Sequence, residues 1–132
     1  MLSSYAHLAM RKEEVMAKLL IVEVEEKALK HNVALFTKAG YEVSSALGRK
    51  SAEQMLRSVE FDIVVLGHTL SKDDRHHLPY MAKKAKEDCA VLVLHNSGHH
   101  HAVDLAIDSR DGDHKVLAAA AEVLATQPVL SR

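Results

Sequence analysis

Short runs of consecutive apolar residues alternate along the chain with segments in which apolar residues recur every three or four positions. Three of the runs are rich in β-branched residues: KLLIV (Lys18 to Val22), DIVVL (Asp62 to Leu66) and AVLVL (Ala90 to Leu94). Such runs are typical of strands buried on both faces of a parallel sheet. YEVSSAL (Tyr41 to Leu47) and DLAID (Asp104 to Asp108) are more polar, as edge strands tend to be. The pattern predicts five strands, three of them central.

Helical periodicity fills most of the gaps between these strands. Leu29, Val33 and Phe36 recur at helical spacing after the first strand, and Gly40 follows where a helix would end. Further helices are expected from Ser51 to about Ser58, where Ser51 and Gln54 form a capping box, and from about Asp113 to Thr126.

The segment around Pro79 is harder to assign. Ser71 and Asp74 suggest a helix start, but proline is disfavoured in a helix interior. We therefore expect a turn or short helical piece over Ser71 to His77, followed by a helix from Pro79 to about Glu87.

Alternating strands and helices indicate an α/β fold with a parallel sheet and right-handed crossovers. With the second and fifth strands at the edges, the strand order is 2-1-3-4-5, that of the flavodoxin-like doubly wound fold. Ligands of such sheets bind beyond the carboxyl ends of the strands, near the switch between the first and third. The stretch FDIVVLGHTLS ends there, at Gly67 and His68.

Composition narrows the class of protein. The 132 residues, 48% of them hydrophobic, fit one domain, and 17 basic against 18 acidic side chains give a net charge of −1. This balance favours neither nucleic acid nor a membrane as partner. No apolar run approaches a membrane span, no signal peptide is recognisable, and Cys89 is the single cysteine, so we expect a soluble cytoplasmic protein. We interpret 1–16 as an N-terminal extension that can form a short helix, 17–127 as the domain, and 128–132 as a tail.

The order of these features resembles the receiver domains of bacterial response regulators. The resemblance is carried by KLLIVEVEE, in which acidic residues follow the first strand, by the segment GYEV, and by the buried strand FDIVVLGHTLS, and it continues in pattern to about Thr126. Receivers hold a metal ion with an acidic pair after the first strand and accept a phosphoryl group on an aspartate that ends the third. A Ser or Thr after the fourth strand and a Lys after the fifth assist.

Most of these positions carry other residues here. The acidic-pair positions are Glu23 and Val24, the acceptor position is Gly67, the hydroxyl position is His95, and the lysine position is at or near Ser109. Together with His68 they form a vestigial pocket. The resemblance thus implies a degenerate receiver, or pseudo-receiver, with no catalytic residue, no bound metal and no cofactor.

Other carboxylates do not replace the acceptor. Asp62 begins the third strand, five residues from Gly67, which is roughly 16 Å away at about 3.3 Å per residue. Asp73 and Asp74 belong to a helix start, where acidic side chains are ordinary.

The ten histidines leave an alternative open. His68 and His95 both follow central strands, and His99, His100 and His101 lie in the next loop, so a metal or phosphoryl site is conceivable. Against it, adjacent histidines cannot all point at one ion, and no short zinc motif such as HExxH occurs. The chain also lacks the glycine-rich nucleotide-binding motifs, and Ser97 near His95 has no orienting acid, so we do not expect an enzyme.

The connection between the fourth and fifth strands is short. Only HNSGHHHAV, His95 to Val103, joins them, whereas a parallel crossover normally takes a dozen or more residues. The fourth helix is therefore expected to be shortened or missing, which would expose apolar side chains on the face that receivers use for partners. The predicted partner surface comprises Val91, Val93, His99, Leu105 and Ile107, covered by a homodimer mate or by the N-terminal extension.

These observations predict a phosphorylation-independent signalling or regulatory module that acts by protein-protein interaction, with a protein partner of unknown identity. The alternative is a small-molecule or metal-binding module that uses His68, His95 and Glu23 at the vestigial pocket.

Overall fold

The computed structural model describes residues 16–95 and 102–126 of the chain. Strands and helices alternate along it. The strands are β1 (Lys18–Glu23), β2 (Glu42–Leu47), β3 (Ile63–Leu66), β4 (Ala90–Val93) and β5 (Leu105–Ala106). The helices are α2 (Glu26–Lys38), α3 (Arg49–Ser58), α4 (Lys72–Ala85) and α5 (Asp113–Ala125), and a 3-10 turn, η1 (Ser109–Asp111), precedes α5.

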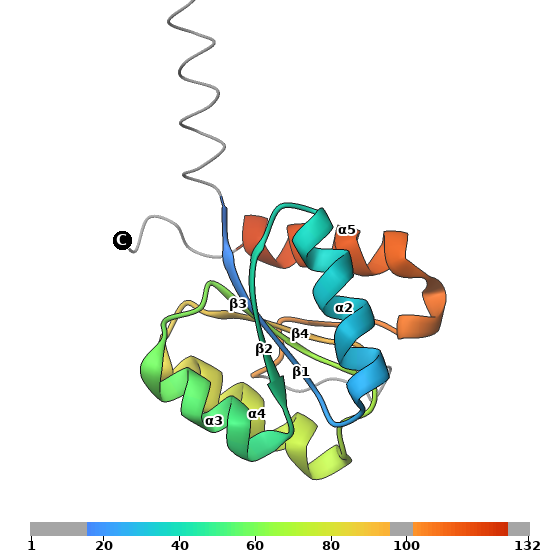
Figure 1. Ribbon diagram of the computed structural model, residues 1–132. Coiled ribbons are helices and arrows are strands. Elements are labelled where there is room, and N and C mark those ends of the chain that lie inside the picture. The colour runs from blue at the N-terminus through green and yellow to red at the C-terminus, as the bar shows by residue number, and fades with distance from the viewer. Residues whose placement is uncertain (1–15, 96–101, 127–132) are drawn as a thin grey trace, which may run out of the picture.

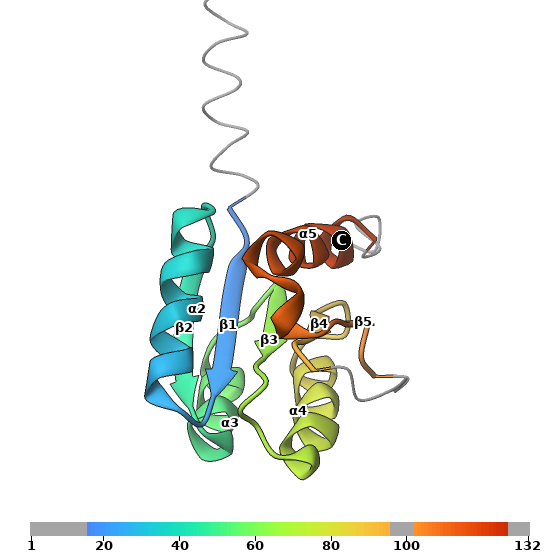
Figure 2. The same ribbon diagram turned by 90° about the vertical axis from the view of Figure 1, so that its right-hand side faces the viewer.

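All five strands form one parallel sheet in the order β2-β1-β3-β4-β5, which confirms the predicted topology. β1 and β3 are neighbours, with Leu19 opposite Ile63 and Val22 opposite Leu66, so the switch point lies between their carboxyl ends. Figures 1 and 2 show α2 and α5 on one face of the sheet and α3 and α4 on the other. The flavodoxin-like doubly wound architecture is therefore present.

The alternation of side chains along each central strand divides the apolar core into two halves. Leu20, Val22 and Val64 face α3 and α4, whereas Leu19 and Ile21 face α2 and α5. Every residue of β3 and β4 is buried, as expected for strands covered on both faces. The more polar β2 and the two-residue β5 form the edges.

Helix α2 ends at the predicted glycine. Gly40 has φ +101°, a conformation that costs a residue with a Cβ, and its N–H donates to Thr37 O. The Tyr41 N–H donates to Phe36 O, which completes a Schellman motif. The Phe36 and Tyr41 rings pack edge to face, with centroids 5.7 Å apart, so the turn into β2 is held by apolar contact as well.

Helix α4 corrects the expected break at Pro79. The helix begins after Ser71, whose side chain accepts a hydrogen bond from Asp74 N as predicted, but it continues through Pro79 to Ala85. Leu78, Pro79 and Ala82 are buried against the core. An interior proline costs about 3 kcal/mol or more locally, and the burial of this face outweighs that cost.

Helix α3 also begins elsewhere than predicted. It begins at Arg49 with Gly48 as N-cap, two residues before Ser51, and no side chain caps it. The capping box assigned to Ser51 and Gln54 is therefore wrong, because both residues already lie inside the helix.

The described residues between β4 and β5 are Leu94, His95 and Ala102 to Asp104. None of them is helical. The exposed face inferred from this is wrong for Val91 and Val93, which are buried in the core half that faces α3 and α4. Val103 and Ala106 pack against the same half and help to cover it. Leu105 and Ile107 are half-buried on the opposite face, and His99 lies outside the described residues.

Directly before the fifth strand, both the backbone and the side chain of Asp104 pair with β4, and the Asp104 N–H donates to Val91 O. The Asp104 carboxylate accepts a hydrogen bond from Val91 N at 2.7 Å and from the Lys83 ammonium at 2.7 Å.

None of the helices in the described residues is long and apolar enough to cross a membrane.

Candidate functional site

A buried carboxylate lies at the switch point of the sheet. Glu23 is the last residue of β1, and its side chain has no exposed surface. Its Oε2 accepts a hydrogen bond from the Asn32 amide at 2.7 Å. Its Oε1 accepts from the Thr69 N–H at 3.0 Å and from the Thr69 hydroxyl at 2.5 Å. Both oxygens are thus hydrogen-bonded, which offsets the cost of burying the carboxylate.

Gly67, at the carboxyl end of β3, makes room for this carboxylate. A Cβ placed on Gly67 would overlap the carboxyl group of Glu23, so any side chain at residue 67 needs Glu23 to move. The carboxylate of the neighbouring strand therefore occupies the space in which a side chain of residue 67 would begin. Gly67 thus provides the space for Glu23 at this end of the sheet.

Thr69 joins the loops that follow β1 and β3. Its hydroxyl donates to Glu23, and the same oxygen accepts from Val24 N at 2.9 Å and, more weakly, from Glu25 N at 3.4 Å. Glu25 is the N-cap residue of α2. The hydroxyl therefore ties the buried carboxylate to the backbone at the start of α2.

Sequence reasoning missed both partners of Glu23. Asn32 is a buried polar residue on α2, between Leu29 and Phe36 on the inward face of that helix. A polar side chain on an otherwise apolar stripe was a signal that could have been used. Thr69 carried no such signal, since threonine is ordinary in a loop.

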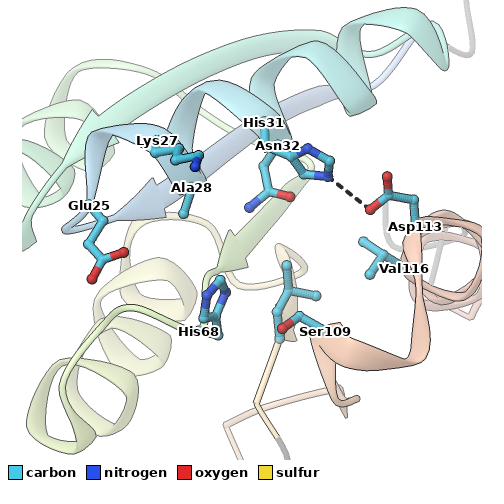
Figure 3. A pocket seen from close by; sticks show the side chains of 10 residues that line it. Glu25, Lys27, Ala28, His31, Asn32, His68, Ser109, Asp113 and Val116 are labelled. Atoms are coloured by element: carbon cyan, nitrogen blue, oxygen red, sulfur yellow. Dashed lines mark hydrogen bonds and ion pairs between the residues drawn. The ribbon is translucent and has the colours of Figure 1, made fainter.

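A cavity of about 370 Å³ opens above this network (Figure 3). His68 lies at its base and Ser109 beside it, while His31 of α2 and Asp113 of α5 approach each other across one side. The His31 Nε2 and Asp113 Oδ1 atoms are 2.9 Å apart, so this pair joins the two helices. His68 is half exposed, and its Nδ1 is 3.9 Å from Glu23 Oε2, within ion-pair range when the imidazole is protonated.

A second cavity of about 380 Å³ adjoins the first and shares His68, Leu94 and Ser109 with it. His95 lines it with a buried Nδ1 that has no hydrogen-bond partner among the described residues. Asp108 and Arg110 line the other side, and hydrogen bonds from Arg110 lower the pKa of the Asp108 carboxyl to about 2.

The structure brings most of the predicted site residues to one edge. His68 and Ser109 line both cavities, His95 lines one, and Glu23 and Gly67 are buried at the switch point. Val24 is 44% exposed and lines neither cavity, although its backbone N–H joins the Thr69 network. Within residues 16–95 and 102–126, no three His, Cys, Asp or Glu side chains are grouped to hold a metal ion.

Comparison of the sequence with known families and with curated proteins finds no match. Comparison of the structure finds receiver domains. A response regulator receiver protein from Sinorhizobium medicae WSM419 has a TM-score of 0.73 at 16% identity, over 86% of this chain and 98% of that one. A CheY-like receiver domain protein from Methanospirillum hungatei JF-1 has a TM-score of 0.72 at 16% identity, over 83% and 94%.

A third structure was solved with magnesium in its active site cleft. It is the receiver domain of the sensor histidine kinase PA1611 from Pseudomonas aeruginosa PAO1, with a TM-score of 0.71 at 11% identity, over 83% of this chain and 98% of that one. The similarity to these proteins extends over nearly their whole length. The chain therefore has the fold of the response regulator receiver domains.

Proposed function

We propose that the protein is a pseudo-receiver: a signalling or regulatory module that acts through protein-protein contact and independently of phosphorylation. The receiver-domain fold supports a signalling role. The proposal includes a cytoplasmic location, a protein partner of unknown identity and no enzymatic activity. A homodimer remains one arrangement to be tested.

One observation carries the proposal. The Glu23 carboxylate fills the space next to Gly67, and its oxygens are held by Asn32 and Thr69. In a phosphorylatable receiver, the residue that corresponds to Gly67 is an aspartate, and the space around it holds a metal ion and a phosphoryl group. Here the carboxylate has no nucleophilic neighbour on β3, and its hydrogen-bond capacity is used by protein donors.

The second candidate is a small-molecule or metal-binding module. It is favoured by the two adjoining cavities and by His95, which lines one of them with His68 and Ser109 and whose buried Nδ1 has no partner in the part of the chain that the structure describes. Such a nitrogen is available to a ligand that enters the second cavity.

Isothermal titration of the protein with Mg²⁺, Zn²⁺ and acetyl phosphate separates the two candidates. The pseudo-receiver is expected to give no binding heat with any of the three. Saturable binding of Zn²⁺ that is lost in His68→Ala and His95→Ala would favour the second candidate. His114→Ala is a suitable control, because His114 is an exposed residue of α5 that lines neither cavity.

A further inference from the structure

A groove lies between the carboxyl-terminal ends of α3 and α4. It is at the end of the sheet where the strands begin, whereas the candidate site is at the end where they finish. It has a volume of about 580 Å³. Leu56, Val59, Met81 and Ala85 contribute apolar surface to it. Val59 and Met81 are only partly buried, although both pack against the core beneath.

Positive charge flanks this apolar floor. Arg57 and Lys84 line the groove, and neither forms an ion pair within the described part of the chain. Glu60 is the single acidic residue among the lining residues. A segment with apolar side chains and carboxylates complements such a surface.

The N-terminal extension enters the domain next to this groove. Lys18 N donates to the Asp62 carboxylate at 2.9 Å, and Asp62 N donates to Lys18 O at 2.8 Å. The Lys86 ammonium is 3.7 Å from the same carboxylate. Both partners are close in sequence to residues that line the groove: Asp62 is two residues after Glu60, and Lys86 directly follows Ala85. The start of β1 and the groove therefore lie at the same end of the sheet.

The sequence of 1–15, which lies outside the described residues, fits the groove in length and chemistry. Leu2, Tyr5 and Leu8 recur every three residues, and Glu13 and Glu14 follow Arg11 and Lys12 near the start of the domain. Leu8 is eight residues from Met16, a separation of about 12 Å if helical and at most about 29 Å if extended. Because β1 begins at the same end of the sheet as the groove, a segment of this length can fold back onto it.

We infer that the N-terminal extension of the same molecule docks in the groove between α3 and α4. Leu8 and Tyr5 lie on the apolar floor, and Glu13 or Glu14 approaches Arg57 or Lys84. This surface differs from the one predicted from sequence, whose inward residues Val91 and Val93 are already covered. The inference is independent of the proposed function, because the groove lies at the amino ends of the strands and the candidate site at their carboxyl ends.

The test compares amide spectra of the full-length protein labelled with ¹⁵N. In Leu8→Asp, the signals of Val59, Met81 and Ala85 are expected to shift, while that of Thr69 at the opposite end of the sheet stays in place. Ser3→Asp is the matched control, because it adds the same charge between the apolar positions, and it should leave the groove signals unchanged. The reciprocal variant Lys84→Glu should shift the signals of Glu13 and Glu14.

Three results would overturn the inference. Groove signals that do not respond to Leu8→Asp would show that the extension is not there. A response confined to β5 and α5 would place the extension on the other surface. Shifts between wild type and Leu8→Asp that disappear on dilution would mean that the groove takes the extension of a second copy.

Discussion

The carboxyl group of Glu23 occupies the position where a side chain on Gly67 would begin. The two residues end neighbouring strands, β1 and β3, and Gly67 N donates a hydrogen bond to Val22 O, directly before Glu23. The glycine and the buried glutamate therefore depend on each other. A side chain at residue 67 would displace the Glu23 carboxyl group, and removal of that carboxyl group would leave the space beside Gly67 empty.

Gly67→Ala is expected to destabilise the fold by roughly 1–3 kcal/mol, the usual cost of overpacking, because the new methyl group displaces Glu23 from its hydrogen bonds. In the background of Glu23→Ala the same substitution should cost much less, since the space is then empty. Chemical denaturation of both single variants and the double variant measures this coupling. Additive free energies of unfolding would contradict the packing relationship.

Thr69→Val removes a hydroxyl that donates to Glu23 and accepts from Val24 N. We expect a loss of about 1–3 kcal/mol, because a buried carboxylate loses a donor and a backbone N–H loses its acceptor. Hydrogen exchange of the Val24 and Glu25 amides should accelerate in this variant. Thr69→Ser keeps the hydroxyl and serves as the control; equal exchange in the two variants would rule out the proposed tie between the loops.

Mg²⁺ and phosphoryl donors are expected to leave the protein unchanged. The melting temperature should be the same with and without millimolar Mg²⁺, since a ligand that binds the native state would raise it. Intact-mass spectrometry after incubation with acetyl phosphate should show no phosphoryl adduct on Asp or Glu. Gly67→Asp alone should not give phosphorylation, because the new side chain overlaps Glu23 and because, by the resemblance to receivers, His95 and Ser109 stand where receivers have the hydroxyl and the lysine. Recovery in that variant would show that these positions are misassigned.

Burial raises the pKa of the Cys89 thiol to about 12. The folded protein should therefore resist alkylation by iodoacetamide at pH 8 and react readily when unfolded in urea. Because the unfolded thiol ionises near pH 9 and the folded one does not, stability should fall above pH 9 by about 1.4 kcal/mol per pH unit. Cys89→Ala should show a weaker decline over the same range; an identical decline would assign it to other groups.

Hydrogen bonds from Arg110 lower the pKa of Asp108 to about 2. The depressed pKa means that this interaction is fully present above about pH 4 and is lost as the pH falls toward 2. A carboxyl titration by NMR is expected to give a value near 2 in the wild type and a higher value in Arg110→Gln. Lys115→Gln, which removes a charge from an exposed position of α5, should leave the Asp108 value unchanged.

The architecture of the sheet could be predicted from the amino-acid sequence. Continuous apolar runs can be buried only in a sheet covered on both faces, so KLLIV, DIVVL and AVLVL were recognisable as β1, β3 and β4, and the polar runs as edges. Gly40 and Ser71 were recognisable as a helix end and a helix start because their roles depend on a few adjacent residues. The absence of a side chain at the end of β3, at Gly67, was likewise visible in the sequence.

The group that fills the switch point of the sheet could not be predicted from the sequence. Glu23, Asn32 and Thr69 come from three separate segments, and only folding shows that they form one hydrogen-bonded group. Tertiary burial also overrode local rules, since α4 continues through Pro79 to keep Leu78 and Ala82 in the core. The packing of Val103 and Ala106 against the core half that contains Val91 and Val93 could not be inferred, because it depends on how a short connection lies across the sheet.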